Sequence, residues 1–149
     1  MAWKPPSVTV AAVIERDGRF LLVDETFEGR RVLNQPAGHL DPGESLVQAC
    51  RREVMEETAH HFEPTGLVGI YRWYYAPKDI TLIRFCFRGK VGSAEDRPLD
   101  KEINSVHWLT AAELQARGAE HRSPMVQQCL DDFLAGRDFP LDVFSKEFP

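Results

Sequence analysis

The 149-residue sequence lacks the features that would place it in several specialised classes of protein. Its three cysteines are odd in number and widely spaced, and they form neither a CxxC pair nor a Cys/His cluster of zinc spacing. We therefore expect reduced thiols and a cytoplasmic location. The longest early apolar run, Val8 to Ile14, is too short to span a membrane and precedes no small-residue cleavage pattern. A membrane protein or an exported protein is thus not expected.

The sequence also lacks an excess of basic residues, internal repeats and polar low-complexity stretches. The net charge of −5 argues against a general affinity for nucleic acid or for anionic lipid. With 43% hydrophobic and 28% charged residues, the composition is ordinary for a globular protein. We expect a single domain over residues 1–149, and we expect a metal ion to recruit any anionic substrate.

The predicted elements follow the order sheet, helix, sheet and then helices. Asp17-Gly18 is a hairpin-turn signal between two β-rich runs, which predicts that these runs form an antiparallel pair. The order favours an α+β layered fold over repeated βαβ units. Strands are predicted at 8–14, 20–24, around 32–33, and at 67–75, 81–87 and 103–109.

Three helices are predicted from capping signals. Ser45 is a candidate N-cap for a helix over 46–58, with apolar residues on one side and carboxylates on another. The segment 110–113 has the Thr-x-x-Glu pattern of a capping box and predicts a short helix. A longer helix is predicted over 124–136, which opens with proline and closes near glycine.

The helix over 46–58 carries the candidate active-site chemistry. Glu53, Glu56 and Glu57 lie three and four residues apart, so they share one helical face. Mg²⁺ is commonly held by a few carboxylates together with substrate phosphates and water, and this spacing supplies such carboxylates. Arg52 lies eight residues after Glu44 and is predicted to tie the preceding loop to the helix. A charge run of this kind can equally be a solvated helix face, and the glutamates alone leave both interpretations open.

A longer pattern includes these residues. Gly38, five residues, Glu44, seven residues, Arg52-Glu53-Val54, one residue and Glu56-Glu57 resemble the Nudix box, GX5EX7REUXEEXGU, of the Nudix hydrolases. Two positions differ, because Ala59 stands where the family has glycine and His60 where it has a bulky aliphatic residue. Beyond the box, VTVAAVI, NQPAGHL, Arg72-Trp73, EINSVHWL, RSPMV and RDFPL resemble the NudJ-like branch of the family.

The resemblance implies a Nudix fold, an α/β/α sandwich around a mixed β-sheet, and a Mg²⁺-dependent phosphohydrolase, with Mn²⁺ as the alternative metal. Members of the NudJ-like branch act on nucleoside tri- and diphosphates and on the pyrophosphate of the thiamine pyrimidine precursor, and they release orthophosphate. Glu53, Glu56 and Glu57 then match the metal-binding positions, and Glu53 is the candidate base. The Gly38 carbonyl is a further candidate ligand, and Glu44 is a supporting charge. Glu102 is the candidate for an additional acidic ligand from a later loop, although a surface role for it stays open.

Residues outside the box suggest where a substrate would bind. Tyr71, Trp73 and Tyr75 alternate along one strand and share a face, on which an aromatic wall could stack a base. Trp73 is the principal candidate, although packing in the core would explain the same pattern, and core packing is expected for Trp108. The other candidate contacts to base or phosphate are Gln35, Arg72, Arg84 and His39.

The leading hypothesis is a hydrolase of small phosphorylated substrates, as a monomer or a homodimer. Another substrate, such as ADP-ribose or a dinucleoside polyphosphate, is the first alternative. The second is a nucleotide-sensing Nudix domain without catalysis, which the joint presence of Glu53, Glu56 and Glu57 disfavours. A structural Ca²⁺ module ranks last, because Ca²⁺ sites draw their oxygens mainly from loops.

Overall fold

The computed structural model describes residues 2–146. The elements follow the predicted order of sheet, helix, sheet and then helices, and the helix predicted over 46–58 is found with those bounds. Of the three short 3₁₀ helices in the described chain, labelled η, two lie in connections and one follows α3. In chain order the elements are β1 (Ser7–Ala12), β2 (Glu15–Arg16), β3 (Arg19–Phe27), β4 (Arg30–Asn34), β5 (Ala37–His39), α1 (Leu46–Thr58), β6 (His60–Tyr75), η1 (Ala76–Lys78), β7 (Ile80–Ala94), β8 (Ile103–Thr110), α2 (Ala111–Ala116), η2 (Gly118–Glu120), α3 (Met125–Leu134) and η3 (Leu141–Val143).

Within residues 2–146 the strands form two four-stranded sheets. The first has the order β5-β1-β7-β6, in which β1 and β7 are parallel and the other neighbours antiparallel. In the second sheet β3 pairs with β2, β4 and β8, always antiparallel. The first sheet thus contains both parallel and antiparallel pairs, which confirms the predicted mixed sheet. Parallel strands need a long crossover connection, and here the elements between β1 and β7 provide it.

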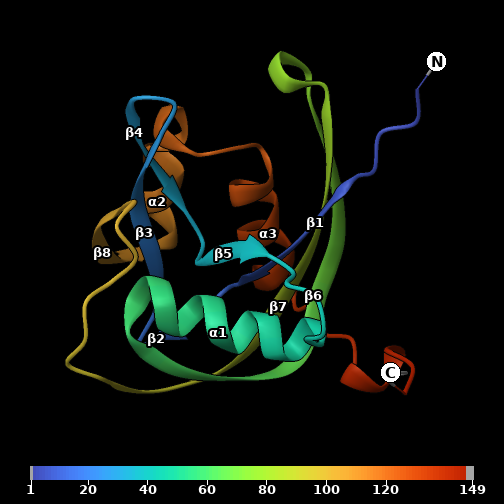
Figure 1. Ribbon diagram of the computed structural model, residues 1–149. Coiled ribbons are helices and arrows are strands. Elements are labelled where there is room, and N and C mark those ends of the chain that lie inside the picture. The colour runs from blue at the N-terminus through green and yellow to red at the C-terminus, as the bar shows by residue number, and fades with distance from the viewer. Residues whose placement is uncertain (1, 147–149) are drawn as a thin grey trace.

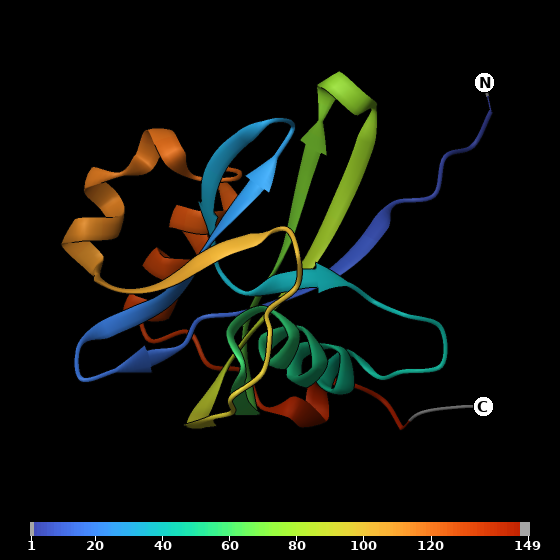
Figure 2. The same ribbon diagram turned by 60° about the vertical axis from the view of Figure 1, so that its left-hand side comes forward.

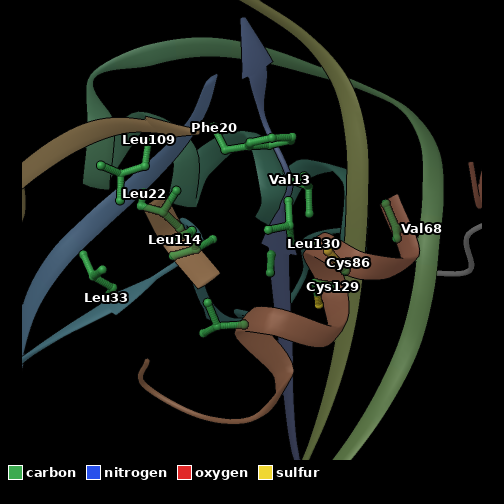
Figure 3. Close-up of a cluster of buried hydrophobic side chains, with 12 residues drawn as sticks. Val13, Phe20, Leu22, Leu33, Val68, Cys86, Leu109, Leu114, Cys129 and Leu130 are labelled. Carbon is green, nitrogen blue, oxygen red and sulfur yellow. The ribbon is translucent and has the colours of Figure 1, made fainter. Parts of the chain in front are cut away.

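Helices cover both faces of the first sheet, as Figures 1 and 2 show. Side chains alternate along β1, so Val10 and Ala12 pack with α1 while Ala11 contributes to the cluster around α3. Figure 3 shows this second cluster, in which Cys129 and Leu130 of α3 lie beside Cys86 of β7. The arrangement is the predicted α/β/α sandwich, and it leaves the carboxylate face of α1 outside the core.

The ends of α1 follow the local rules of helix capping. The Ser45 hydroxyl accepts from the Gln48 amide at 2.9 Å, and the Gln48 side chain accepts from the Ser45 amide, which completes a capping box. At the other end Ala59 is left-handed, with φ 58°. Alanine thus stands where the Nudix box pattern has glycine, at a position that favours glycine, while the next residue, His60, packs edge-on against Trp108.

The predicted pairing of the first two long strands is wrong. The Asp17-Gly18 turn is confirmed, with positive φ at both residues, but it closes only the short β2–β3 hairpin. β1 instead lies in the other sheet, between β5 and β7. The Val13 amide donates to the Phe87 carbonyl and the Ile14 carbonyl accepts from Leu21, so the chain passes from one sheet to the other at this point.

The predicted hairpin in the middle of the chain is confirmed but is longer than expected. β6 and β7 continue beyond the predicted limits into the 60–66 and 88–94 regions, with register shifts on the way. Gly89 looks like a strand breaker in the sequence. A Cβ there would overlap the carbonyl of Glu63, so glycine allows the two strands to stay paired at Pro64.

Candidate metal and substrate site

A cleft of about 430 Å³ lies between α1, the floor of the first sheet and the segment that precedes α3. Among the described residues its arginines are Arg84 and Arg122, while carboxylates are far more numerous. A cleft with such an excess of negative charge favours cations, and it repels a free phosphate. The carboxylates that line it are Glu25, Asp41, Glu53, Glu56, Glu57, Asp100 and Glu102.

Three of these carboxylates meet at one point. Oxygen atoms of Glu53, Glu56 and Asp100 lie within 4.8 Å of one another. The two glutamates are neighbours on α1, whereas Asp100 comes from the segment between β7 and β8, which passes the carboxyl end of α1 (Figure 2). Backbone hydrogen bonds hold this segment there, from the Asp100 amide to the Glu56 carbonyl at 2.9 Å and from Glu95 to Ala59 at 2.7 Å.

Glu57 lies deeper in the same site. Its side chain accepts a hydrogen bond from the Ala37 amide at 2.9 Å, and the residue is only 4% exposed. Burial raises the pKa of Glu57 to about 9, and the nearby charges of Glu25, Glu53 and Asp100 act in the same direction. Since no arginine or lysine among the described residues forms an ion pair with it, the ionised carboxylate would need another cation beside it.

Glu53 and Asp100 show the same shortage of positive charge. Burial is the main reason that the pKa of Glu53 is raised, and the ion pair with Arg52 offsets it only in part. Burial and the neighbouring Glu56 also raise the pKa of Asp100. Carboxylates whose ionisation is disfavoured when no metal is bound are the donor set that a hard divalent cation would stabilise.

The backbone leaves room for this arrangement at Gly38. β5 runs beside α1, and a Cβ on residue 38 would overlap the Glu53 carboxylate. The glycine therefore lets the Glu53 carboxylate keep this position, and it also leaves the backbone at residue 38 close to the carboxylate cluster. The donor set and this close approach both fit a metal ion bound by carboxylate and carbonyl oxygens.

Arg52 joins the loop before α1 to the acidic face. Its guanidinium donates to Glu44 at 3.0 and 2.6 Å and to the His39 carbonyl at 2.9 Å. It also donates to Glu53 at 2.8 Å and to Glu56 at 3.2 Å. These bonds raise the pKa of Arg52 and lower that of Glu44, so each partner favours the charged form of the other. The structure thus shows the loop-to-helix tie predicted from their spacing.

The structure distributes the predicted substrate residues over three locations. Trp73 and His39 line the cleft, and so does Arg84, which is only 3% exposed. Gln35 lies behind the lining, where it donates to the Val126 carbonyl at 2.8 Å. Arg72 is exposed and outside the cleft lining, because neighbouring residues of β6 face opposite sides of the sheet.

Glu102 lines the cleft, but it is Asp100 that joins the oxygen cluster. Sequence reasoning missed Asp100, Glu25 and Arg122. Asp100 lies two residues before Glu102 in a segment without helix or strand. Such a segment has no regular repeat from which the direction of a side chain could be predicted. The pairing of Arg122 with Glu25, at 2.9 Å, joins residues 97 positions apart and has no local signal.

Comparisons with known proteins agree with this geometry. A family model described as the NUDIX domain matches residues 3–129. The chain is 35% identical over 139 residues to the proteins named Phosphatase NudJ from Shigella boydii and Escherichia coli K12, covering 93% of this chain and 90% of theirs. A solved NUDIX hydrolase from Nitrosomonas europaea superposes with a TM-score of 0.93 at 50% identity, over 96% of this chain and 98% of that one.

A more distant solved structure shares the fold alone. The MutT NUDIX hydrolase from Burkholderia pseudomallei superposes with a TM-score of 0.75 at 19% identity, over 87% of this chain and 98% of that one. In the described part of this chain, no helix is both long enough and apolar enough to cross a membrane.

Proposed function

Because the chain belongs to the Nudix hydrolase family, related to phosphatase NudJ, we propose that its acidic cleft is the active site of a Mg²⁺-dependent phosphohydrolase. The substrates we propose are nucleoside tri- and diphosphates and related small diphosphates, with release of orthophosphate. The observation that carries this proposal is the meeting of Glu53, Glu56 and Asp100 in a cleft that also contains Trp73 and two arginines.

The residues that would hold the metal are Glu53, Glu56 and Asp100, with Glu57 and the Gly38 carbonyl beside them. Mg²⁺ is the preferred ion, and Mn²⁺ the alternative, because both favour oxygen ligands. When bound, such an ion neutralises charge on phosphate oxygens and lowers the pKa of water. Glu102 is a further candidate from the same cleft wall.

The chain's own residues then divide the remaining work. Glu53 is the candidate base, since a carboxylate whose pKa is raised toward neutrality accepts a proton more readily. Arg52 fixes the Glu53 side chain by its hydrogen bond and fixes the entering loop through Glu44. His39 lies exposed at the rim, where it can contact a phosphate.

Two other functions remain to be separated from this one. A Nudix hydrolase of ADP-ribose or of a dinucleoside polyphosphate would use the same acidic cluster with a different leaving group. A nucleotide-sensing domain would bind in the cleft without turnover. The complete set of carboxylates favours catalysis over sensing.

One panel separates these functions. The protein with Mg²⁺ would be given nucleoside di- and triphosphates, a dinucleoside polyphosphate, ADP-ribose and the thiamine pyrimidine pyrophosphate, and orthophosphate and pyrophosphate would be measured separately. We expect orthophosphate from both di- and triphosphates. Turnover confined to ADP-ribose would contradict the proposed substrate class, and tight binding without turnover would favour a sensor.

Glu56→Gln tests the acidic cluster in the same assay, and we expect it to lower kcat by about a hundredfold or more. Glu120→Gln is the matched control, because Glu120 pairs with Arg117 on the surface away from the cleft. Full turnover in Glu56→Gln with Mg²⁺ present would contradict the assignment.

A further inference from the structure

The cleft has a second end, formed by the floor of the first sheet and the start of α3. Strand register places Trp73 opposite Leu82 and Thr9 opposite Arg84, and Leu82 and Arg84 share one face of β7. All four line the cleft, and Met125 lines it from α3. A flat indole, two apolar side chains and a guanidinium therefore line the cleft from the first sheet and α3, and none of them comes from the helix that carries the glutamates.

Arg84 is the unusual member of this group. It is 3% exposed, yet no carboxylate among the described residues forms an ion pair with it. Its guanidinium donates to Gln35 and Asn34, both at 3.0 Å, and to the Cys129 sulfur at 3.8 Å. The acceptors are therefore two side-chain amides and one cysteine sulfur, and none of them is a carboxylate. A buried guanidinium is normally paired with an anion, because an unpaired buried charge is costly.

A count of donors points the same way. A guanidinium has five N–H donors, and the side-chain partners of Arg84 account for three of them. Nε has no hydrogen-bond partner in the described chain. The remaining donor belongs to Nη2, whose other hydrogen is bonded to Asn34. The guanidinium is thus held by three neighbours while two of its donors, the buried Nε–H and one N–H of Nη2, have no partner in the described chain.

The neighbouring arginine is differently placed. Arg122 donates to the buried Glu25 at 2.9 Å, and its guanidinium lies 3.5 Å from the centre of the Phe27 ring. Glu25 also accepts from Asn34 at 3.2 Å, so the chain of side chains from Arg122 to Arg84 contains two cations and one anion. Arg122, Glu25 and Arg84 together therefore carry one positive charge in excess, and both arginines line the cleft.

We propose that Arg84 is a specificity-determining residue that donates a hydrogen bond to an acceptor oxygen on the edge of a flat ring held against Trp73. The proposal rests on the proposed function, since it gives the binding position of the ring of a substrate whose phosphates bind near the glutamates. Arg84 would then favour rings that carry a carbonyl group at that edge, such as uracil or hypoxanthine, over cytosine and adenine, which carry an amino group there. An amino group would bring a second donor to the Arg84 donor and leave both unpaired.

The test compares matched pairs of diphosphates. kcat/KM would be measured for UDP against CDP and for IDP against ADP. We expect the carbonyl member to be favoured at least tenfold in at least one pair, and we expect Arg84→Gln to reduce that ratio to near one. Arg88→Lys is the control, because Arg88 is on the same strand but outside the cleft lining, and its ratio should match that of the unaltered chain.

Several outcomes would overturn the proposal. Equal kcat/KM within both pairs, or a preference that persists in Arg84→Gln, removes the role of Arg84. A uniform loss for all four substrates in Arg84→Gln, without a change in ratio, assigns Arg84 to the phosphates or to the fold.

A phosphate-free measurement covers the case in which Arg84→Gln does not fold. The nucleosides inosine, adenosine, uridine and cytidine would be tested for binding to the unaltered protein, and to Trp73→Phe, by tryptophan fluorescence quenching. The same carbonyl preference is expected, with quenching that Trp73→Phe removes; equal binding within both pairs overturns the proposal. A nucleoside preference without any nucleotide turnover would retain the ring assignment while the proposed hydrolase function fails.

Discussion

Gly38 and Glu53 approach so closely that a single methyl group on residue 38 would overlap the Glu53 carboxylate. The glycine that begins the box and the glutamate fifteen positions later are thus one unit, in which the absence of a side chain on β5 makes room for a charged group on α1. This relationship explains physically why the box begins with glycine. It also makes a direct prediction.

Gly38→Ala should lower kcat by about 10²-fold, because the added Cβ displaces the Glu53 carboxylate from the cluster and small misplacements of catalytic groups are costly. The carboxylate is the far end of a flexible side chain and can move aside, so the loss of stability should stay below the roughly 1–3 kcal/mol typical of overpacking. Phosphate-release kinetics and thermal unfolding would measure the two effects. Gly118→Ala is the control, since a Cβ there meets no atom within 4 Å and φ is not positive; comparable activity in the two mutants would contradict the prediction.

Asp100→Asn should weaken activation by Mg²⁺ about 10- to 100-fold, because it removes one of the three carboxylates that meet at the cluster. Activity titrated against Mg²⁺ concentration would measure this. Asp96→Asn, an exposed change in the same segment, should leave the titration unaltered. Glu102→Gln makes the comparison complete. If it has the larger effect, the acidic ligand from this segment is Glu102, as expected from sequence, and not Asp100.

The affinity for Mg²⁺ should rise with pH through the raised pKa of Glu57. The group has an ordinary pKa of 4.5 and a folded-state pKa of about 9, so in the metal-free protein it carries a proton at neutral pH. Binding of a cation displaces that proton, and apparent affinity should therefore increase by up to tenfold per pH unit as pH approaches 9. Calorimetric titration in buffers of different ionisation enthalpy would detect the released proton.

The same shift fixes the sign of the effect on stability without metal. A raised acidic pKa stabilises the folded state fully below pH 4.5, and this contribution is lost as pH rises toward 9, because the unfolded state releases its proton first. Glu57→Gln should therefore lessen the decline in the free energy of unfolding between pH 5 and 9. It should also reduce the proton release on addition of Mg²⁺. Affinity that is flat from pH 6.5 to 8.5 in the unaltered protein would contradict both expectations.

Ala59→Gly should stabilise the protein by about 1 kcal/mol, because Ala59 is left-handed with φ 58° and glycine adopts that conformation without strain. For a chain of this size the expected rise in Tm is about 3 °C. Ala135→Gly is the matched control, since Ala135 ends α3 with φ −73°, where glycine gives no relief. Differential scanning calorimetry of both mutants would measure the change, and an equal or lower Tm for Ala59→Gly would show that the left-handed alanine is not strained.

Local signals predicted the parts of the fold that depend on neighbouring residues. The bounds of α1, the Ser45 cap and the Asp17-Gly18 turn all follow from interactions within a few positions. The same local rules could not assign the partner of β1. Its pairing with β7 depends on burial of both faces of the strand, with Val10 in one hydrophobic cluster and Ala11 in the other. The extended β6–β7 hairpin depends on a backbone contact between Gly89 and Glu63, which no window of sequence reveals.

For the site, the sequence by itself determined the carboxylates on α1, the Arg52–Glu44 tie and the family, because helical periodicity and a long fixed spacing are properties of one continuous segment. Only the tertiary structure decided that Asp100 completes the cluster, that Glu57 is buried and that Arg84 is a buried cation in the floor of the cleft. These depend on segments that are distant in the chain and close in space. Burial and charge compensation, which set the chemistry of such groups, exist only after the chain has folded around them.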